Sequence, residues 1–261
     1  MTKRRTAVGL AVLFALALSA FAAASASAKG TTAFTCVTDP NGTLKGDHCL
    51  TTGSGEKSKH VAIPHNETTT GTATNENTTE ETKAARSAIL HGNISGVATE
   101  VTCPKVHGEG TFENRTTEPE TKGEMYAHAE GKLHYTECVV KKPEGKGCKV
   151  ANEGTITTEQ LTGTTEGQGD AALIKPKVGE TFTEIKIEGC SIPALNNTFP
   201  VKGAVKAEIN GATLLSQGSV TTTEKTLKFG GNPAGLDGAL TLKAHSKAGE
   251  ETNPLSATTV E

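Results

Sequence analysis

Large aromatic side chains are scarce in this sequence. The chain of 261 residues has no tryptophan, and aromatic residues make up 3% of it. Sugar-binding sites usually stack the sugar on an aromatic ring, so the composition argues against carbohydrate binding by stacking. The scarcity also predicts a thin hydrophobic core. We therefore disfavour a ligand carrier with an apolar barrel interior, because few large side chains are present to line such a pocket.

Arginine is scarce as well, and the net charge is negative. Beyond Arg5 the only arginines are Arg86 and Arg115, and the whole chain carries a formal charge of −3. A nucleic-acid binder needs a basic surface to neutralise phosphates and arginines to read base edges. A helix that lies on a membrane surface needs a basic amphipathic stripe. The composition therefore argues against both kinds of partner.

The N-terminus has the pattern of a secretory signal peptide. Lys3, Arg4 and Arg5 precede an apolar run over residues 7–21, and small residues then lead to an Ala-Ser-Ala site that ends at Ala28. The run lacks stop-transfer charges, and the C-terminal residues are not a hydrophobic anchor. We predict a signal peptide over residues 1–28, no membrane span after cleavage, and a secreted, extracellular protein.

Six cysteines in an exported chain predict three disulfide bonds. The sequence alone does not select one connectivity, and we favour the three local pairs. A pairing exchanged between the last two pairs is the main alternative. A zinc site is the other, although the chain has no C-x-x-C pair and the compartment is oxidising. The three favoured pairs are Cys36–Cys49, Cys103–Cys138 and Cys148–Cys190.

Two segments of the chain resemble each other. Residues 103–140 and 148–192 each begin near a cysteine with Lys-Val, continue to Glu-Gly-Thr and an apolar residue, and close on a cysteine. Aligned on the closing cysteines, Tyr135 falls on Ile187. This pattern predicts two similar β-units, each held by its own disulfide. Chance similarity in a chain rich in Thr, Gly and Glu is the alternative.

The segments before these units differ from one another in composition. Residues 29–50 predict a disulfide-closed N-terminal hairpin that turns at Asp39-Pro-Asn-Gly42. Residues 51–85 are rich in Thr, Glu and Asn and have little to bury, so we expect a polar loop or linker there. One or two helical turns are expected over residues 83–90. The remaining residues, 86–261, are predicted to form a β domain that contains the two units.

Alternation of apolar and polar residues predicts the strands of this domain. It runs through residues 97–103 and through residues 199–209, which we predict as one strand that ends at the Asn210-Gly211 turn. Shorter strands are expected over residues 227–229 and 236–242. Many short strands and no long helical period indicate an all-β fold. We expect a disulfide-stapled β-sandwich or open barrel with an internal duplication.

No motif points to catalysis, a cofactor or a metal. None of the eight histidines forms an H-x-H or H-E-x-x-H pair, no calcium loop is present, and no G-x-S-x-G turn occurs. We therefore name no catalytic, cofactor-binding or metal-binding residue, and the only candidate site residues are the six cysteines. Glutamates are numerous, and a pair of them acting as acid and base of a hydrolase is kept as the alternative.

Short segments around the cysteines and near the end of the chain form a further pattern. They are Phe34-Thr-Cys-Val37, Asp47-His-Cys49, His60-Val-Ala-Ile63, Gly145-Lys-Gly-Cys-Lys-Val150, Glu188-Gly-Cys-Ser-Ile192, Pro200-Val-Lys-Gly203 and residues 254–261. Together they resemble a group of exported, cysteine-containing proteins of high-GC Gram-positive (actinobacterial) soil bacteria. That group has no assigned activity, so the resemblance implies a bacterial source and no site residues.

These observations predict a secreted or envelope-associated, non-enzymatic β protein that acts as an interaction or structural module. Its partner is unknown, and a cell-envelope polymer or another surface protein are the candidates. The alternative is a secreted hydrolase that uses a glutamate pair. We expect the disulfides to supply stability that the thin core does not.

Overall fold

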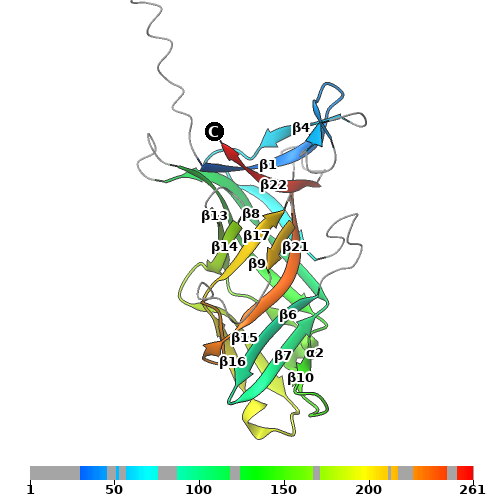
Figure 1. Cartoon of the computed structure of the whole chain (residues 1–261), viewed down its shortest axis with the longest axis vertical. Coiled ribbons are helices and arrows are strands. Elements are labelled where there is room, and N and C mark those ends of the chain that lie inside the picture. The colour runs from blue at the N-terminus through cyan, green and yellow to red at the C-terminus, as the bar shows by residue number, and fades with distance from the viewer. Residues whose placement is uncertain are drawn as a thin grey trace, which may run out of the picture.

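The computed structural model describes residues 30–45, 51–52, 57–75, 87–117, 124–166, 171–210, 213–216, 226–245 and 252–260. Nearly all regular structure in these residues is β-strand, which confirms the all-β fold class. Figure 1 shows the strands along one long axis, with a layer across one end, a barrel in the middle and two facing sheets at the other end. The predicted signal peptide over residues 1–28 lies outside the described residues.

The barrel is a closed ring of eight antiparallel strands. Each strand pairs with the next in the ring, and β21 pairs with β5 to close it, so the ring is closed where the sequence led us to expect an open barrel or a sandwich. Closure leaves no free edge, so every strand satisfies its backbone groups on both sides. In ring order the strands are β5 (Thr69–Thr74), β8 (Lys105–Thr116), β9 (Met125–Thr136), β13 (Leu161–Glu166), β14 (Ala171–Pro176), β17 (Val205–Asn210), β18 (Thr213–Ser216) and β21 (Gly235–His245).

A layer of strands, the cap layer, lies across one end of the barrel (Figure 1). In it, β1 lies between β22 and β4, and β2 pairs with β3 and β4. The strands of the layer are β1 (Gly30–Thr38), β2 (Leu44–Lys45), β3 (Thr51–Thr52), β4 (Lys57–Ala62) and β22 (Thr252–Val260).

The turn predicted after β1 is confirmed, and the return strand of the hairpin predicted for residues 29–50 lies partly outside the described residues. The N–H of Gly42 donates to the carbonyl of Asp39 at 2.8 Å, as expected for the turn. In the described part of this region, however, β1 and β2 are both neighbours of β4 rather than of each other. The long strand β4 also brings His60 onto Phe34, with ring centroids 3.9 Å apart, a contact that the two-residue strand β2 does not supply.

Two sheets face each other at the far end of the molecule and form the two-sheet region. One sheet continues from β21 through β6 (Ala88–Ile94), β7 (Val97–Cys103) and β10 (Val139–Lys142). The other contains β11 (Lys149–Val150), β15 (Thr181–Glu188), β16 (Thr198–Lys202), β19 (Lys228–Phe229) and β20 (Asn232–Pro233). The short elements α2 (Ala151–Gly154), β12 (Ile156–Thr157) and η1 (Pro193–Leu195) lie between these strands along the chain.

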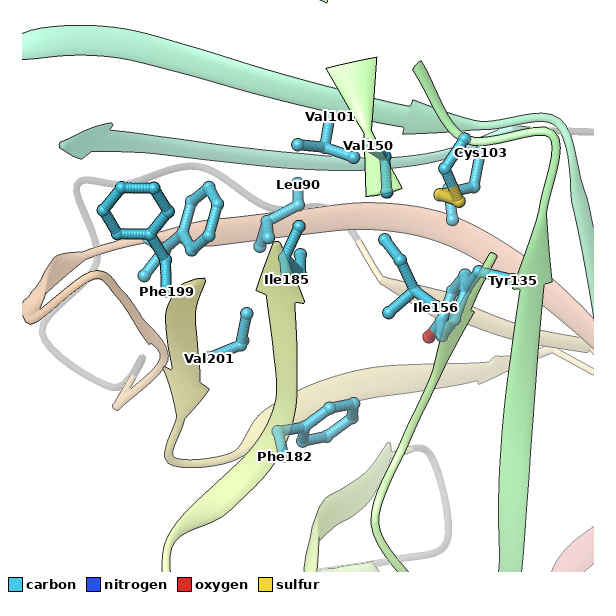
Figure 2. Close-up of a cluster of buried hydrophobic side chains, with 14 of the residues drawn as sticks. Leu90, Val101, Cys103, Tyr135, Val150, Ile156, Phe182, Ile185, Phe199 and Val201 are labelled. Carbon is cyan, nitrogen blue, oxygen red and sulfur yellow. A yellow bond between two sulfur atoms is a disulfide. The ribbon is translucent and has the colours of Figure 1, made fainter. Parts of the chain in front are cut away.

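Large apolar side chains fill the space between these two sheets (Figure 2). Leu90 and Val101 come from one sheet, and Ile185 comes from the other. Phe199 and Phe229 pack edge to face, with ring centroids 6.2 Å apart, and Phe229 is completely buried. Each such side chain contributes roughly 2 kcal/mol of hydrophobic free energy when it is fully buried. The core is therefore concentrated in this region.

The polar linker predicted for residues 51–85 is wrong in part, because it contains β4 and β5. Every residue of β5 is paired with β8, so the part of the segment predicted as a loop from Thr68 includes a strand of the barrel. The inward residues of β5 are Gly71 and Ala73. Such small residues bury little apolar area, so the composition of the segment does not predict a strand. Backbone hydrogen bonds to both neighbouring strands hold β5 in the barrel. Residues 76–86 lie outside the described residues.

Two further expectations are corrected. The last three residues of the segment expected to form helical turns, residues 88–90, belong to β6, which pairs along its length with β7. The single strand expected over residues 199–209 is two strands in different sheets, β16 and β17. Gly203 lies between them with a φ of +103°, which only glycine adopts easily, and redirects the chain from the facing sheet into the barrel. The hairpin expected at Asn210 is confirmed by the Asn210–Thr213 pair.

The two predicted units share the ladder next to their closing cysteines. Val106 pairs with Tyr135, and the aligned Val150 pairs with Ile187. The Glu-Gly-Thr segments differ, because residues 109–111 continue strand β8 whereas residues 153–154 form the tight turn of α2 with positive φ. The likeness between the units is therefore confined to the residues near the cysteines.

Candidate functional site

The cysteines lie where the sequence placed them in two of the three predicted pairs. Cys103 is bonded to Cys138 and Cys148 to Cys190, with Cα atoms 4.1 Å apart in each pair, so both predicted pairs are confirmed. Both bonds lie in the two-sheet region. Cys103 and Cys138 lie where β7 and β9 end, whereas Cys148 precedes β11 and Cys190 follows β15. Cys36 is a half-cystine in β1. Its predicted partner Cys49 lies outside the described residues.

An apolar cavity lies inside the barrel, and we call it the barrel cavity. It has a volume of about 140 Å³, and its surface is almost entirely apolar. Eight-stranded barrels are just wide enough either to be filled by their own side chains or to hold one small ligand. This barrel is not filled, and the reason lies in the residues that point inward.

Small residues meet one another across the strands that line the barrel cavity. Along one row of paired residues, Gly71 of β5, Gly110 of β8 and Gly131 of β9 are consecutive neighbours. In the rows on either side, Ala73 pairs with Gly108, and Ala129 pairs with Gly163. The same rows also carry larger side chains, because Gly108 pairs with Leu133 and Ala129 pairs with Phe112. The small residues reduce the side-chain volume inside the barrel, and the cavity lies between them and these larger apolar side chains.

Larger apolar side chains close the ends of the cavity. Leu133, Ile174 and Leu240 lie toward the two-sheet region, where they pack against its hydrophobic core. Ala33 of β1 and Leu255 of β22 lie at the other end and belong to the cap layer. The cavity thus has a side-chain wall at one end and a layer of strands at the other.

Asn114 attaches the cap layer to the barrel. It is 1% exposed, and its side-chain carbonyl accepts the N–H of Ala33 at 2.7 Å. Its amide group donates to Thr32 Oγ1 at 2.9 Å, to the carbonyl of Ala33 at 3.0 Å and to the carbonyl of Ile63 at 2.8 Å. A buried amide with all its hydrogen bonds made holds one geometry, because breaking any bond leaves a buried polar group unpaired. Asn114 therefore fixes β1 over this end of the cavity.

A second contact holds β1 to β13, two strands along the ring from β8. Thr31, which is 2% exposed, shares a short hydrogen bond with the hydroxyl of Thr165 on β13. The same Thr165 hydroxyl accepts the N–H of Ala127 at 2.9 Å. Thr165 is one of the few polar side chains at the cavity, and its hydroxyl is already engaged by these two groups. The rim therefore adds little polar character to an apolar interior.

The charged residues next to the cavity lie on the outer face of the barrel. Glu109 alternates with the inward Gly108 and Gly110, and its side chain is 80% exposed. Glu130 receives a hydrogen bond from Lys177 Nζ at 2.5 Å, and this bond, together with a contact to His128, lowers the pKa of the carboxyl. A general acid of a hydrolase needs a raised pKa. The carboxylates near the cavity are therefore suited to surface ion pairs.

Histidines take part in ion pairs on the outside of the fold. His91 of β6 contacts Asp237 Oδ2 at 2.8 Å and Glu100 Oε2 at 3.6 Å, and Lys142 also binds Glu100 at 2.8 Å. Within the residues that the structure describes, no group of three His, Cys, Asp or Glu side chains is placed to hold a metal ion. The opposite charges of this cluster instead link β6, β7, β10 and β21.

The sequence reasoning missed the barrel cavity and argued against it. It held that too few large side chains were available to line an apolar pocket, whereas glycines and alanines line this cavity together with larger residues such as Phe112 and Leu161. The signal was present as alternating Gly and Ala at Gly71, Ala73, Gly108 and Gly110. In a strand this spacing places all of them on one face. Scarcity of large side chains therefore favours a cavity once the strands close into a ring.

Comparison with known proteins assigns no family to this chain. Searches against protein-family models, curated proteins and solved structures found no match. Among the described residues, no helix is long and apolar enough to cross a membrane. The resemblance to exported actinobacterial proteins stays a prediction.

Proposed function

We propose that this protein is a secreted, non-enzymatic binding protein whose barrel takes up one small apolar molecule. The observation that carries the proposal is the barrel cavity, an apolar space of about 140 Å³ inside a closed ring of strands. An engineered apolar cavity of similar size is known to stay dry and to bind benzene. The ligand would accordingly be of about six non-hydrogen atoms, or a ligand part of that size.

Two further observations support binding over catalysis. Backbone and apolar side chains, both small and large, form the surface of the cavity, so it offers a ligand hydrophobic contact and few directional groups. The nearby Glu130 is held as an ion pair with Lys177, and its lowered pKa opposes the proton donation that a hydrolase requires. Disulfide bonds and the absence of a membrane-crossing helix in the described residues are compatible with an extracellular protein.

Titration calorimetry of the oxidised protein with benzene and with 1-hexanol tests the proposal. We expect a dissociation constant on the order of 0.1–1 mM, because about six apolar carbons leave water. Gly163→Val is the blocking variant. A Cβ at Gly163 would meet only Ala129 Cβ at 3.7 Å and Ile174 Cγ1 at 3.9 Å, so the added side chain enters the cavity without a clash.

The matched control is Thr162→Val on the same strand. Thr162 alternates with the inward Leu161 and Gly163, so its side chain faces out of the barrel. We expect this variant to bind both probes as the unmodified protein does, while Gly163→Val binds neither and unfolds at the same temperature or higher. Absence of binding by the unmodified protein, or equal binding by Gly163→Val, would contradict the proposal.

A further inference from the structure

Two smaller cavities continue from the barrel cavity toward the two-sheet region. The second cavity has a volume of about 40 Å³ and shares Leu133, Ile174 and Leu240 with the barrel cavity, so these three side chains are the wall between them. The third cavity, also about 40 Å³, shares Tyr135 and Phe182 with the second. Both of these rings belong to the cluster drawn in Figure 2. The three cavities therefore adjoin one another in series, from the barrel into the core.

The wall between the first two cavities is not tightly packed. Leu133, Ile174 and Leu240 all point into the barrel, yet each is only partly buried. A side chain that borders a cavity on two sides makes few dispersion contacts on those sides. It therefore loses few contacts when it changes rotamer. Rotation of these three side chains would join the barrel cavity to the second cavity.

We infer that the ligand is a single unbranched alkyl chain, which lies along this series of cavities and passes between Leu133, Ile174 and Leu240. The inference rests on the proposed function and names its ligand class. A compact ring would use only the barrel cavity. A linear chain uses all three cavities, because its width suits narrow cavities in series better than any compact shape does.

The size of the cavities sets the length of the chain. The barrel cavity accommodates about six carbons, by comparison with an engineered cavity that takes benzene. The smaller cavities add room for about three more. Each methylene group that enters an apolar site raises the affinity about fourfold. A chain of about nine carbons should therefore bind roughly 50-fold more tightly than one of six.

Gly238 allows the second cavity to be filled separately from the first. It lines the second cavity and not the barrel cavity, and a Cβ there would meet Ala88 at 3.6–3.7 Å, an ordinary contact. Gly238→Val therefore fills the far part of the series and leaves the barrel cavity open. It is matched to Gly163→Val, which fills the barrel cavity itself.

The test is calorimetric titration of the oxidised full chain with 1-alkanols of four to ten carbons, and with the alkanoates of the same lengths to cover a charged head group. We expect the affinity of the unmodified protein to rise about fourfold per carbon up to about nine carbons for at least one head group. In Gly238→Val the rise should stop at about six carbons. Gly163→Val should bind no chain length, and Thr162→Val should match the unmodified protein.

The outcomes separate this inference from the proposed function. If the affinity levels off at about six carbons in the unmodified protein while Gly163→Val abolishes binding, the wall stays closed, and the inference is overturned while the proposed function stands. An equal rise with length in the unmodified protein and in Gly238→Val also overturns the inference, since the chain then runs elsewhere. If no chain length or benzene binds, both fail.

Discussion

The barrel and the two-sheet region are built from similar strands and share β21, but their interiors are filled in opposite ways. In the two-sheet region the side chains of Ile187 and Phe229 are 1% and 0% exposed. In the barrel the corresponding inward positions include Gly71, Gly110 and Gly131. A closed ring satisfies its backbone hydrogen bonds on every strand and keeps its shape without a filled interior. Two short facing sheets have free edges, and they depend on side-chain packing and on disulfides.

The largest expected effect is on the disulfides of the two-sheet region. They close segments of 35 and 42 residues, for which the chain-entropy model gives about 4 kcal/mol of stabilisation each. We expect the paired variants C103A/C138A and C148A/C190A each to lower the free energy of unfolding, measured by urea denaturation, by an amount near this value, and so to lower the urea midpoint. Unchanged midpoints in both variants would mean that packing alone holds this region.

The next effect concerns the attachment of the cap layer to the barrel. In the unmodified protein the Asn114 amide donates hydrogen bonds to the carbonyls of Ala33 and Ile63. Asn114→Asp keeps the shape of the side chain but replaces this donor with an oxygen that faces both carbonyls. We expect a loss of about 3 kcal/mol of unfolding free energy, because buried acceptors lose their donors. Asn93→Asp on an exposed position of β6 is the control and should change stability by less than about 0.5 kcal/mol. Equal effects of the two changes would show that Asn114 does not anchor β1.

Two glycines allow the same substitution to be compared in the two regions. A Cβ at Gly92 of the two-sheet region would lie 3.0 Å from Phe229 Cδ1, whereas a Cβ at Gly163 of the barrel would have no neighbour closer than 3.7 Å. We expect Gly92→Val to cost about 1–3 kcal/mol through overpacking and Gly163→Val to change stability by less than about 1 kcal/mol. Thermal unfolding of both variants makes the comparison. Similar losses would indicate that the two interiors are equally full.

The smallest effect is the pH dependence of an ion pair on the outer face of the barrel. The hydrogen bond from Lys177 lowers the pKa of Glu130 from its usual value of 4.5. A lowered pKa adds stability above the usual value, and this stability is lost as the pH falls through the lowered one. Because the pair is partly exposed, we expect about 0.5 kcal/mol, measured as the difference between the unmodified protein and Lys177→Met at pH 6 that disappears near pH 2. A difference that persists at pH 2 would contradict this assignment.

Local features of the fold could be predicted from the sequence. The predicted signal peptide and the cysteine spacing led to the pairs Cys103–Cys138 and Cys148–Cys190, and alternation led to strand β7. These features depend on neighbouring residues or on short chain segments. Closure of the barrel depends on the pairing of β5 with β21, which lie far apart in the chain, and no local pattern specifies it.

The candidate site could not be predicted for a related physical reason. A search of the sequence for large apolar residues does not assign Gly108 and Gly110 to the core. In the closed ring, however, both residues line the cavity. The break at Gly203 was missed because the apolar alternation continues across it from β16 into β17. In both cases glycine determines the structure through what it lacks.

The most direct measurement of the contrast between the two regions is a methyl NMR titration of the oxidised protein with 1-hexanol. Leu133, Leu161 and Leu242 report on the barrel, and Ile187 and Leu195 report on the two-sheet region. We expect saturable shifts of the three barrel methyl groups and none for the other two. Shifts of similar size in both regions would contradict the claim that only the barrel binds apolar molecules. The absence of shifts in the barrel at millimolar ligand would contradict binding in the barrel cavity.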